Sequence, residues 1–267
     1  MPTAPEPPDP GRPARRGGRM AEDAAVEEVP VWLEVNGTPA VTWMCTPDQL
    51  EELAVGWLAG EGYIDRVDEL VLRPCATDLG FWATVPEARV EIILQQGRRT
   101  VLASGCGAVS SWLLEDGGRA SPALSRPLPP SPASLRELFK SLFARGTRYQ
   151  TTGGIHAAAL VDGEALIAHA EDIGRHNAVD KVVGAAMLAA RDIAGLGLLV
   201  TGRISAELAA KAARAGIAWV ATPSVPSTLA VEIAGKAGMT LVGRAVSGSP
   251  GVHEPTARPP VRPSARP

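Results

Sequence analysis

The stretch LGLLVTGRISAELAAKAARAGIAWVATPSVPSTLAVEIAGKAGMTLVG, residues 196–243, decides the fold of the C-terminal half of this 267-residue chain. Its apolar runs LGLLV, IAWVA and MTLVG are separated by two Ala-rich segments with helical character, which begin at Ser205 and Ser227. Strands that alternate with helices usually form a parallel sheet that helices cover. The stretch therefore predicts a βαβαβ unit.

The residues upstream extend this unit into an α/β domain over residues 134–248. A helix is predicted from Ser134, with Glu137 completing its capping pattern, to Gly146. Two strands, AAALV and ALIAHA, are joined by an Asp-Gly turn, and a second helix is predicted from about Ala178 to Arg191.

The N-terminal part, residues 29–119, predicts a smaller α+β domain rich in strands. VWLEVNG and the following TPAVTWM alternate around an Asn-Gly turn, which is typical of a hairpin. Thr46 and Gln49 form a capping box with Pro47 at the first helical position, and the helix is predicted to end at Gly60 or Gly62. FWATV, ARVEIIL and RTVLAS are predicted to be further strands.

Three stretches rich in proline separate or flank these domains. Residues 1–28 and 249–267 predict disordered tails, because their composition buries too little apolar surface to order a chain. Residues 120–133, rich in Pro and Ser, predict a linker.

Composition excludes several classes of protein. The net charge of −3 and pI of about 5.9 give no global attraction to nucleic acid or to an anionic membrane. Three cysteines at unrelated spacings argue against a disulfide framework and indicate a reducing compartment. With neither an apolar run of membrane-spanning length nor a secretory signal pattern, we expect a cytoplasmic protein.

Three loops at predicted strand ends carry groups that suit an anion. In α/β sheets, ligands bind beyond the carboxyl ends of strands, where helix N-termini offer free N–H groups. These loops are TTGGIH, EDIGRHN and TGRIS. They supply one glycine, two histidines and two arginines: Gly154, His156, His176, Arg175 and Arg203. The alternative is that the two arginines pair with Asp172, Glu207 or exposed carbonyls.

One apparent metal motif is incomplete. His169-Ala170-Glu171 matches the H-x-E of zinc-dependent deaminases, but the P-C-x-x-C that would complete the site has no counterpart, since no cysteine follows Cys106. We therefore expect no metal site and interpret His169 as a strand residue.

Cys106 is the most unusual cysteine. Gly105 and Gly107 leave it little steric cover and leave amide N–H groups able to face a thiolate. Cys45 and Cys75 are instead interpreted as inert, buried side chains. A lone exposed thiol of this kind suits a nucleophile or a sulfur carrier.

Several long segments, in order over about residues 31–243, resemble the formate dehydrogenase accessory sulfurtransferase family, FdhD. They are EVNGTPAVTWMCTPDQLEELAVGWLAGEGYI, SGCG, TTGGIHAAAL, EDIGRHNAVDKVVG, TGRISAELAAKAARAGI and PSVPSTLAVEIAGKAGMTLVG. The resemblance implies a three-layer α/β/α C-terminal domain of the cytidine deaminase type without its zinc site. It also implies a cytoplasmic homodimer.

The activity that the resemblance implies is sulfur transfer. Cys106 would take sulfur from a cysteine desulfurase as a persulfide. It would pass that sulfur to the bis-guanylylated molybdenum or tungsten cofactor (bis-MGD). The protein would bind this cofactor through its guanine nucleotides. The cofactor would then be inserted into formate dehydrogenase. His156 would orient the cofactor, move a proton or make a structural hydrogen bond. Asp180 and Lys181 would pair with one another or face the site.

Three positions depart from the family pattern. Many relatives have a second cysteine where this chain has Val109. The segment that contacts the cofactor in relatives carries an aromatic and a basic residue where this chain has Arg244 and Ser249. That segment is Arg244, Ala245, Val246, Ser247, Gly248 and Ser249.

Two other functions remain open from the residues. The protein would be a non-catalytic chaperone that binds the cofactor if Cys106 were incidental. It would be a cysteine hydrolase if Cys106 and His156 formed a nucleophile and base.

Overall fold

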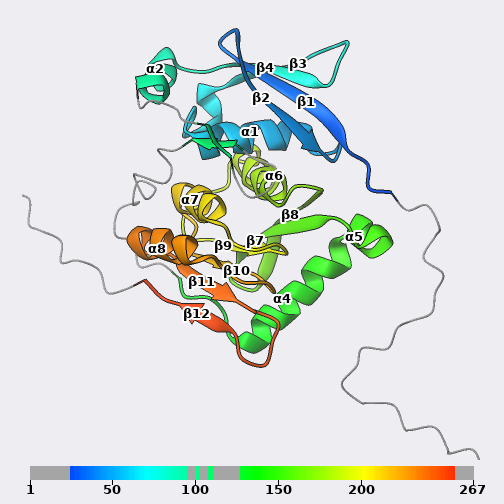
Figure 1. The fold of residues 1–267 in the computed structure, drawn as a ribbon, viewed down its shortest axis with the longest axis vertical. Coiled ribbons are helices and arrows are strands. Elements are labelled where there is room, and N and C mark those ends of the chain that lie inside the picture. Colours follow the sequence, from blue (N-terminus) through cyan, green and yellow to red (C-terminus); the bar gives the residue numbers. More distant parts are fainter. Residues whose placement is uncertain (1–24, 96–99, 103–107, 111–126, 256–267) are drawn as a thin grey trace, which may run out of the picture.

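The computed structural model describes residues 25–95, 100–102, 108–110 and 127–255, and it forms two main sheets and a short two-stranded ribbon (Figure 1). The smaller main sheet comes from the N-terminal part and the larger one from the C-terminal part. Cys106 and residues 120–126 of the predicted linker lie outside the described residues.

The smaller sheet has four strands in the order β2-β1-β4-β3. β1 pairs antiparallel with β2 and parallel with β4. Asn36 and Gly37 join β1 to β2 with positive φ angles of 48° and 77°, the conformation that a two-residue hairpin turn requires, so the predicted hairpin is confirmed. The elements of this part are β1 (Val29–Val35), β2 (Thr38–Cys45), α1 (Leu50–Glu61), a 3₁₀ turn (Val67–Glu69), β3 (Val71–Pro74), β4 (Gly80–Thr84), α2 (Glu87–Gln95), β5 (Thr100–Leu102) and β6 (Ala108–Ser110).

The larger sheet has six strands in the order β12-β11-β10-β9-β7-β8. β9, β10 and β11 are parallel, and they are connected by α7 and α8 as the βαβαβ pattern predicts. β7 is antiparallel to both β9 and β8. The elements are α4 (Pro132–Arg145), α5 (Thr147–Thr152), β7 (His156–Asp162), β8 (Ala165–Asp172), α6 (Arg175–Leu188), β9 (Gly197–Val200), α7 (Ala206–Arg214), β10 (Trp219–Ala221), α8 (Thr228–Ala237), β11 (Thr240–Gly243) and β12 (Gly251–His253).

Helices cover both faces of the larger sheet, which gives the three predicted layers. Alternate strand residues point to opposite faces, so Leu198 and Val220 pack with α6, α7 and α8, whereas Leu199 and Trp219 pack with α4. Figure 1 shows α7 and α8 on one side of the strands and α4 on the other. The prediction of an α/β fold with a smaller second sheet is confirmed.

The helix α1 joins the two sheets. One of its faces packs with β1 through residues such as Leu33, Leu53 and Leu58. Its other face lies directly on α6, where Gly56 and Gly184 meet: a β-carbon on Gly56 would lie 1.8 Å from the Asp180 carbonyl oxygen, and one on Gly184 would lie 1.9 Å from that of Glu52. The two helix backbones are therefore in contact, and only glycine fits at these positions.

The prediction of a strand at ARVEIIL is wrong, because these residues form most of α2. Only Val90 and Ile93 of its apolar side chains turn inward, at the spacing of one helical turn, whereas Ile92 and Leu94 are exposed. Arg89 also pairs with Asp65, a contact that comes from tertiary structure and is not visible in the local pattern.

Three helix starts differ from the predictions. α4 is capped by Ser131 and begins at Pro132, not at the predicted Ser134. Thr46 does not cap α1; the N-cap is Gln49, with a φ of 48° and no side-chain hydrogen bond, and Thr46 is buried against the turn after β8. The helix predicted from Ala178 begins at Arg175, so Arg175 and His176 lie in its first turn and not in a loop.

The predicted C-terminal tail contains one strand. β12 falls within residues 249–267 and pairs antiparallel with β11, with Val252 opposite Val242. Backbone hydrogen bonds to the open edge of a sheet order this short segment, although its composition resembles that of a tail.

Candidate functional site

The predicted site residues gather at one edge of the larger sheet. The parallel strands β9, β10 and β11 end at this edge, followed by Thr201, Thr222 and Arg244. β7 begins and β8 ends at the same edge, because His156 pairs with Asp172. The structure thus brings to one place the three loops that were predicted to bind an anion, together with the segment that begins at Arg244.

His156 and Arg175 meet over Gly202. A β-carbon added to Gly202 would lie 3.0 Å from Arg175 Cδ and 3.2 Å from His156 Cε1, so the glycine lets both side chains approach the loop after β9. His156 Nδ1 lies 3.3 Å from Thr201 Oγ1. Burial, and then the charge of Arg175, lower the pKa of His156. The ring is therefore neutral at neutral pH.

Arg175 has a guanidinium with unused hydrogen-bonding capacity. Its Nε is buried and has no hydrogen-bond partner in the described part of the chain. Neither Arg175 nor Arg203 makes an ion pair with any described residue, and Asp172 pairs with Lys181 instead. Among the described residues, neither arginine makes an ion pair with Asp172 or Glu207 or a hydrogen bond with a carbonyl, so Arg175 keeps donors available for an anion.

His176 is buried and held by α7. Its Nε2 lies 3.1 Å from Ser205 Oγ and 3.2 Å from a carboxylate oxygen of Glu207. Burial, with the charges of Lys211 and Arg175, lowers the pKa of His176 to about 3. An uncharged ring at this place contributes hydrogen bonds and packing, not positive charge.

Two helices point their N-termini to this edge. Ser205 caps α7 by accepting a hydrogen bond from the Leu208 N–H at 3.4 Å, and Arg203 stands just before it with an exposed side chain. α6 begins at Gly174 with no side-chain cap. The first-turn N–H groups of α6, next to Arg175, are a suitable environment for an anion.

The segment Arg244–Ser249 follows β11 and is tied to its neighbours at the edge. Ala245 N–H donates to the Thr222 carbonyl at 2.9 Å, and Thr222 Oγ1 donates to the Gly202 carbonyl at 2.7 Å. Arg244 has a φ of 51°. Its Nη2 would lie 3.8 Å from a β-carbon on Gly251, which places the guanidinium beside β12.

The remaining predicted residue, Gly154, is exposed between α5 and β7. Its N–H donates to Thr152 Oγ1 at 3.3 Å. Thr151 and Thr152 belong to the short helix α5, which the sequence did not indicate, and Gly153 ends that helix with a φ of 64°.

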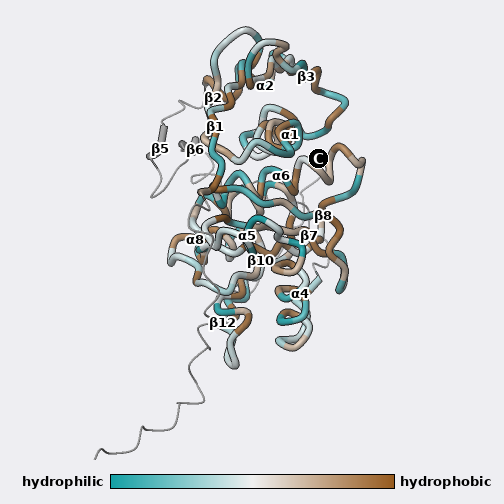
Figure 2. Tube along the Cα trace, turned by 90° about the vertical axis from the view of Figure 1, so that its right-hand side faces the viewer, coloured by the Kyte–Doolittle hydropathy of each residue, from teal (hydrophilic) through white to brown (hydrophobic). Residues whose placement is uncertain are grey.

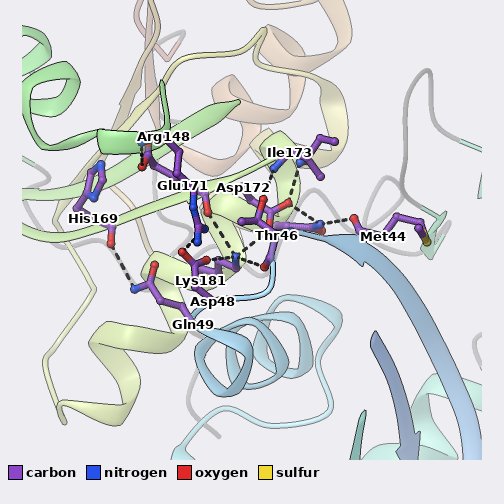
Figure 3. Close-up of polar contacts among 12 residues, drawn as sticks. Met44, Thr46, Asp48, Gln49, Arg148, His169, Glu171, Asp172, Ile173 and Lys181 are labelled. Carbon is purple, nitrogen blue, oxygen red and sulfur yellow. Dashed lines mark hydrogen bonds and ion pairs between the residues drawn. The ribbon is translucent and has the colours of Figure 1, made fainter. Parts of the chain in front are cut away.

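A buried polar network, which sequence reasoning missed, lies beside the site (Figure 3). Asp180 and Lys181 neither pair with one another nor face the anion-binding edge. Asp180 pairs with Lys211 at 2.6 Å, and Lys181 pairs with Asp172 at 2.8 Å and Asp48 at 2.9 Å. No local signal indicates these partners, because Asp48 and Lys211 are distant in the sequence.

The two described cysteines differ in environment. Cys45 is buried, and burial raises the pKa of its thiol to about 12. The thiol therefore stays protonated and unreactive, as predicted. Cys75 is only half-buried, contrary to the prediction, because β3 lies at the edge of its sheet; a hydrogen bond with Thr77 lowers the pKa of its thiol.

The strands that flank Cys106 form the short ribbon. β5 and β6 pair antiparallel, with Leu102 opposite Ala108. Cys106 belongs to the connection between them, which lies outside the described residues. Val109, the position of the second cysteine in many relatives, is on β6 opposite Val101.

His169 lies in the middle of β8, opposite Ala159, as predicted for a strand residue. Its Nε2 is buried without a hydrogen-bond partner among the described residues. Within the described ranges, no group of three or more His, Cys, Asp or Glu side chains is arranged to hold a metal ion.

Comparison with known proteins places this chain in a family. The sequence model of the FdhD/NarQ family matches residues 26–258. The chain belongs to the FdhD/NarQ family. It is 36% identical over 234 residues to a protein of Xanthomonas campestris pv. campestris (strain B100) named sulfur carrier protein FdhD, covering 85% of this chain and 83% of that one. A Bacillus subtilis (strain 168) protein of the same name is 34% identical over 233 residues, covering 87% and 88%.

A solved structure shares the fold of this FdhD/NarQ member. It is a crystal structure from Desulfotalea psychrophila, described as a candidate formate dehydrogenase accessory protein. It matches with a TM-score of 0.67 at 24% identity over 85% of this chain and 87% of that chain. Among the described residues, no helix has the length and apolar character to cross a membrane.

Proposed function

We propose that this protein is a sulfur carrier for the maturation of formate dehydrogenase, with Cys106 as the residue that carries the sulfur. The observation on which the proposal depends is membership of the FdhD/NarQ family, whose curated relatives are named sulfur carrier proteins. The position of Cys106 between β5 and β6 is consistent with this role, because the cysteine belongs to a short connection between strands.

The loading step is a thiol–persulfide exchange. The Cys106 thiolate attacks the terminal sulfur of a persulfide on a cysteine desulfurase, and a new S–S bond forms at Cys106. The S–S bond of the desulfurase breaks, and its cysteine leaves as a thiolate with the electron pair. If the sulfur is delivered as sulfide to a metal, a further thiol reductant supplies two electrons and is oxidised to a disulfide.

The acceptor is the bis-guanylylated molybdenum cofactor, which the protein would bind as a substrate through its phosphates and guanines. Arg175 would pair with a phosphate, and the first-turn N–H groups of α6 and α7 would add hydrogen bonds. Arg203 and the segment Arg244–Ser249 would extend the contact along the same edge. His156 would donate or accept a hydrogen bond as a neutral ring. We expect a cytoplasmic homodimer that meets both the desulfurase and the dehydrogenase.

Intact mass spectrometry tests the carrier role. After incubation with a cysteine desulfurase and cysteine, we expect an added mass of about 32 Da that a reductant removes, as for a persulfide. The added mass should map to Cys106 and be absent from C106A. C75A is the matched control, because Cys75 is the more exposed of the two described thiols, and it should load like the wild type. Sulfur on Cys75 alone would contradict the proposal.

The same variants separate the two alternative functions. A chaperone that only binds the cofactor would support formate dehydrogenase activity with C106A as well as with the wild type. A cysteine hydrolase would accumulate a thioester on Cys106 in place of a single sulfur atom. We expect C106A to lose dehydrogenase maturation and no thioester to form.

A further inference from the structure

The side chain of Lys181 is fully buried and joins three segments of the chain (Figure 3). Its Nζ donates to the Thr46 carbonyl at 3.0 Å and to Asp48 Oδ1 at 2.9 Å, both in the connection between β2 and α1. It also lies 3.3 Å from the Glu171 carbonyl and 2.8 Å from Asp172 Oδ2, at the end of β8. One ammonium group thus links the N-terminal part to the edge of the larger sheet.

The turn between β8 and α6 is held by the partners of Lys181. Asp172 accepts hydrogen bonds from the Thr46 N–H at 3.1 Å, the Gly174 N–H at 2.7 Å and Asn177 Nδ2 at 2.9 Å. Thr46 Oγ1 accepts from the Ile173 N–H at 3.1 Å. Arg175 follows this turn directly, so the turn fixes where α6 and its first basic side chain begin.

The charged groups of the network all have partners. Asp48 pairs with both Lys181 and Arg148, Asp172 pairs with Lys181, and the Glu171 carboxylate accepts hydrogen bonds from the Arg148 and Tyr149 backbone N–H groups. Of these pairs, only Lys181–Asp172 is buried on both sides, and buried ion pairs seldom stabilise a protein more than apolar residues of the same volume. Buried ion pairs do hold the neighbouring backbone and side chains in one orientation, and a binding site depends on such fixed surroundings.

We propose that Lys181 is a positioning residue, which fixes the start of α6 so that Arg175 and the first-turn N–H groups face the anion together. This inference rests on the proposed function, because it makes Lys181 a support for the phosphate-binding edge. Lys181 itself does not touch the ligand. Its effect passes through Asp172 and Thr46 to the turn.

Two buried lysines make a matched comparison. Lys181 and Lys211 both pair with aspartates, but Lys211 contacts Asp180 on α6 and, within the described part of the chain, makes no hydrogen bond to the turn. We would compare K181M with K211M. T46V is a milder third variant, since it removes only the hydroxyl that accepts from the Ile173 N–H and leaves the buried charges paired.

The affinity for GDP, as a soluble guanine nucleotide probe, is measured by calorimetry at pH 8, where His176 is uncharged. Hydrogen exchange of the Ile173 and Gly174 amides is measured on the same folded samples. We expect K181M and T46V to weaken GDP binding about tenfold and to speed exchange at the turn, as for other residues that orient a binding group. K211M should bind GDP like the wild type even if it is equally destabilised.

The outcomes distinguish the two proposals. If the wild type binds GDP and both K181M and T46V bind it equally well, the positioning role is wrong while the proposed function stands. If K211M weakens binding as much as K181M, the effect is general destabilisation and the positioning role is also wrong. If the wild type does not bind GDP, the cofactor-binding part of the proposed function fails, and the positioning role fails with it.

Discussion

At the scale of the residue, Arg175 has a buried Nε that no described group satisfies. A charge-assisted hydrogen bond contributes about 1.5–3 kcal/mol, which corresponds to about ten- to hundredfold in affinity. We therefore expect R175M to weaken GDP binding by that factor in calorimetric titrations at low salt. The control is R136M. Arg136 is exposed on α4, at the opposite face of the sheet, so its replacement should leave GDP binding unchanged. Equal losses in both variants would show that only net charge matters.

His176 makes stability depend on pH. The unfolded ring takes up a proton near its ordinary pKa of about 6.5. In the folded protein, burial lowers the pKa of His176 to about 3. Between these values the unfolded state binds more protons, so the contribution to stability is complete above pH 6.5 and is lost as the pH falls.

The H176Q variant tests this dependence. Between pH 7 and pH 5 the wild type should lose about 2 kcal/mol of unfolding free energy through this ring. H176Q keeps a group able to bond Ser205 but does not titrate, so its loss should be smaller by that amount. Urea denaturation at the two pH values measures both. Parallel losses in the two proteins would show that His176 is not the titrating group.

The site residues that sequence reasoning identified are those in local motifs. EDIGRHN and TGRIS indicated Arg175, His176 and Arg203, because loops after strands have a known geometry in α/β sheets. The function of Lys181 was not predictable, since its partner Asp48 lies 133 positions away. Only the tertiary structure brings these two side chains together.

At the scale of the element, the contact between α1 and α6 depends on Gly56 and Gly184. A methyl group on Gly56 would overlap the Asp180 carbonyl, and overpacking of this kind costs about 1–3 kcal/mol or more. We expect G56A to lower the free energy of unfolding by at least about 3 kcal/mol, measured by urea denaturation.

The control for G56A lies one turn further along the same helix. A β-carbon on Gly60 would make an ordinary contact at 3.5 Å with Lys211 Cδ. Because alanine favours helix more than glycine does, G60A should be neutral or more stable by up to about 1 kcal/mol. Similar destabilisation by both substitutions would contradict the close contact of the backbones.

Some helices and strands could be predicted from the local sequence pattern, and others could not. The strands of the βαβαβ unit were predicted because they are buried on both faces and appear as short apolar runs. ARVEIIL appears similar, but Arg89 pairs with Asp65 and only one side of the segment is buried, so it forms α2. Thr46 matches a capping box, yet its hydroxyl bonds the Ile173 N–H. In both cases a tertiary contact outweighed a local preference.

At the scale of the whole molecule, α1 lies between the two main sheets (Figure 1), where it belongs to the core of the smaller sheet and packs against α6 of the larger one. Besides the glycine contact, Lys181 binds the Thr46 carbonyl, and Arg214 Nε of α7 donates to the Ala59 carbonyl of α1 at 3.0 Å. Figure 2 shows α1 and α6 side by side between the upper and lower parts. Neither part keeps a complete set of buried contacts if the other unfolds.

This arrangement predicts one cooperative unfolding transition. When Trp112 and Trp219 are replaced by phenylalanine, tryptophan fluorescence reports on the N-terminal part alone. The remaining tryptophans lie in its sheet and in α1: Trp32, Trp43, Trp57 and Trp82. Far-UV circular dichroism reports mainly on the C-terminal helices. In urea, we expect the two signals of W112F/W219F to change together, because coincident transitions indicate two-state unfolding. If fluorescence changed at a lower urea concentration, the N-terminal part would unfold independently, and the link through Lys181 and the glycine pair would be too weak to position the edge of the larger sheet.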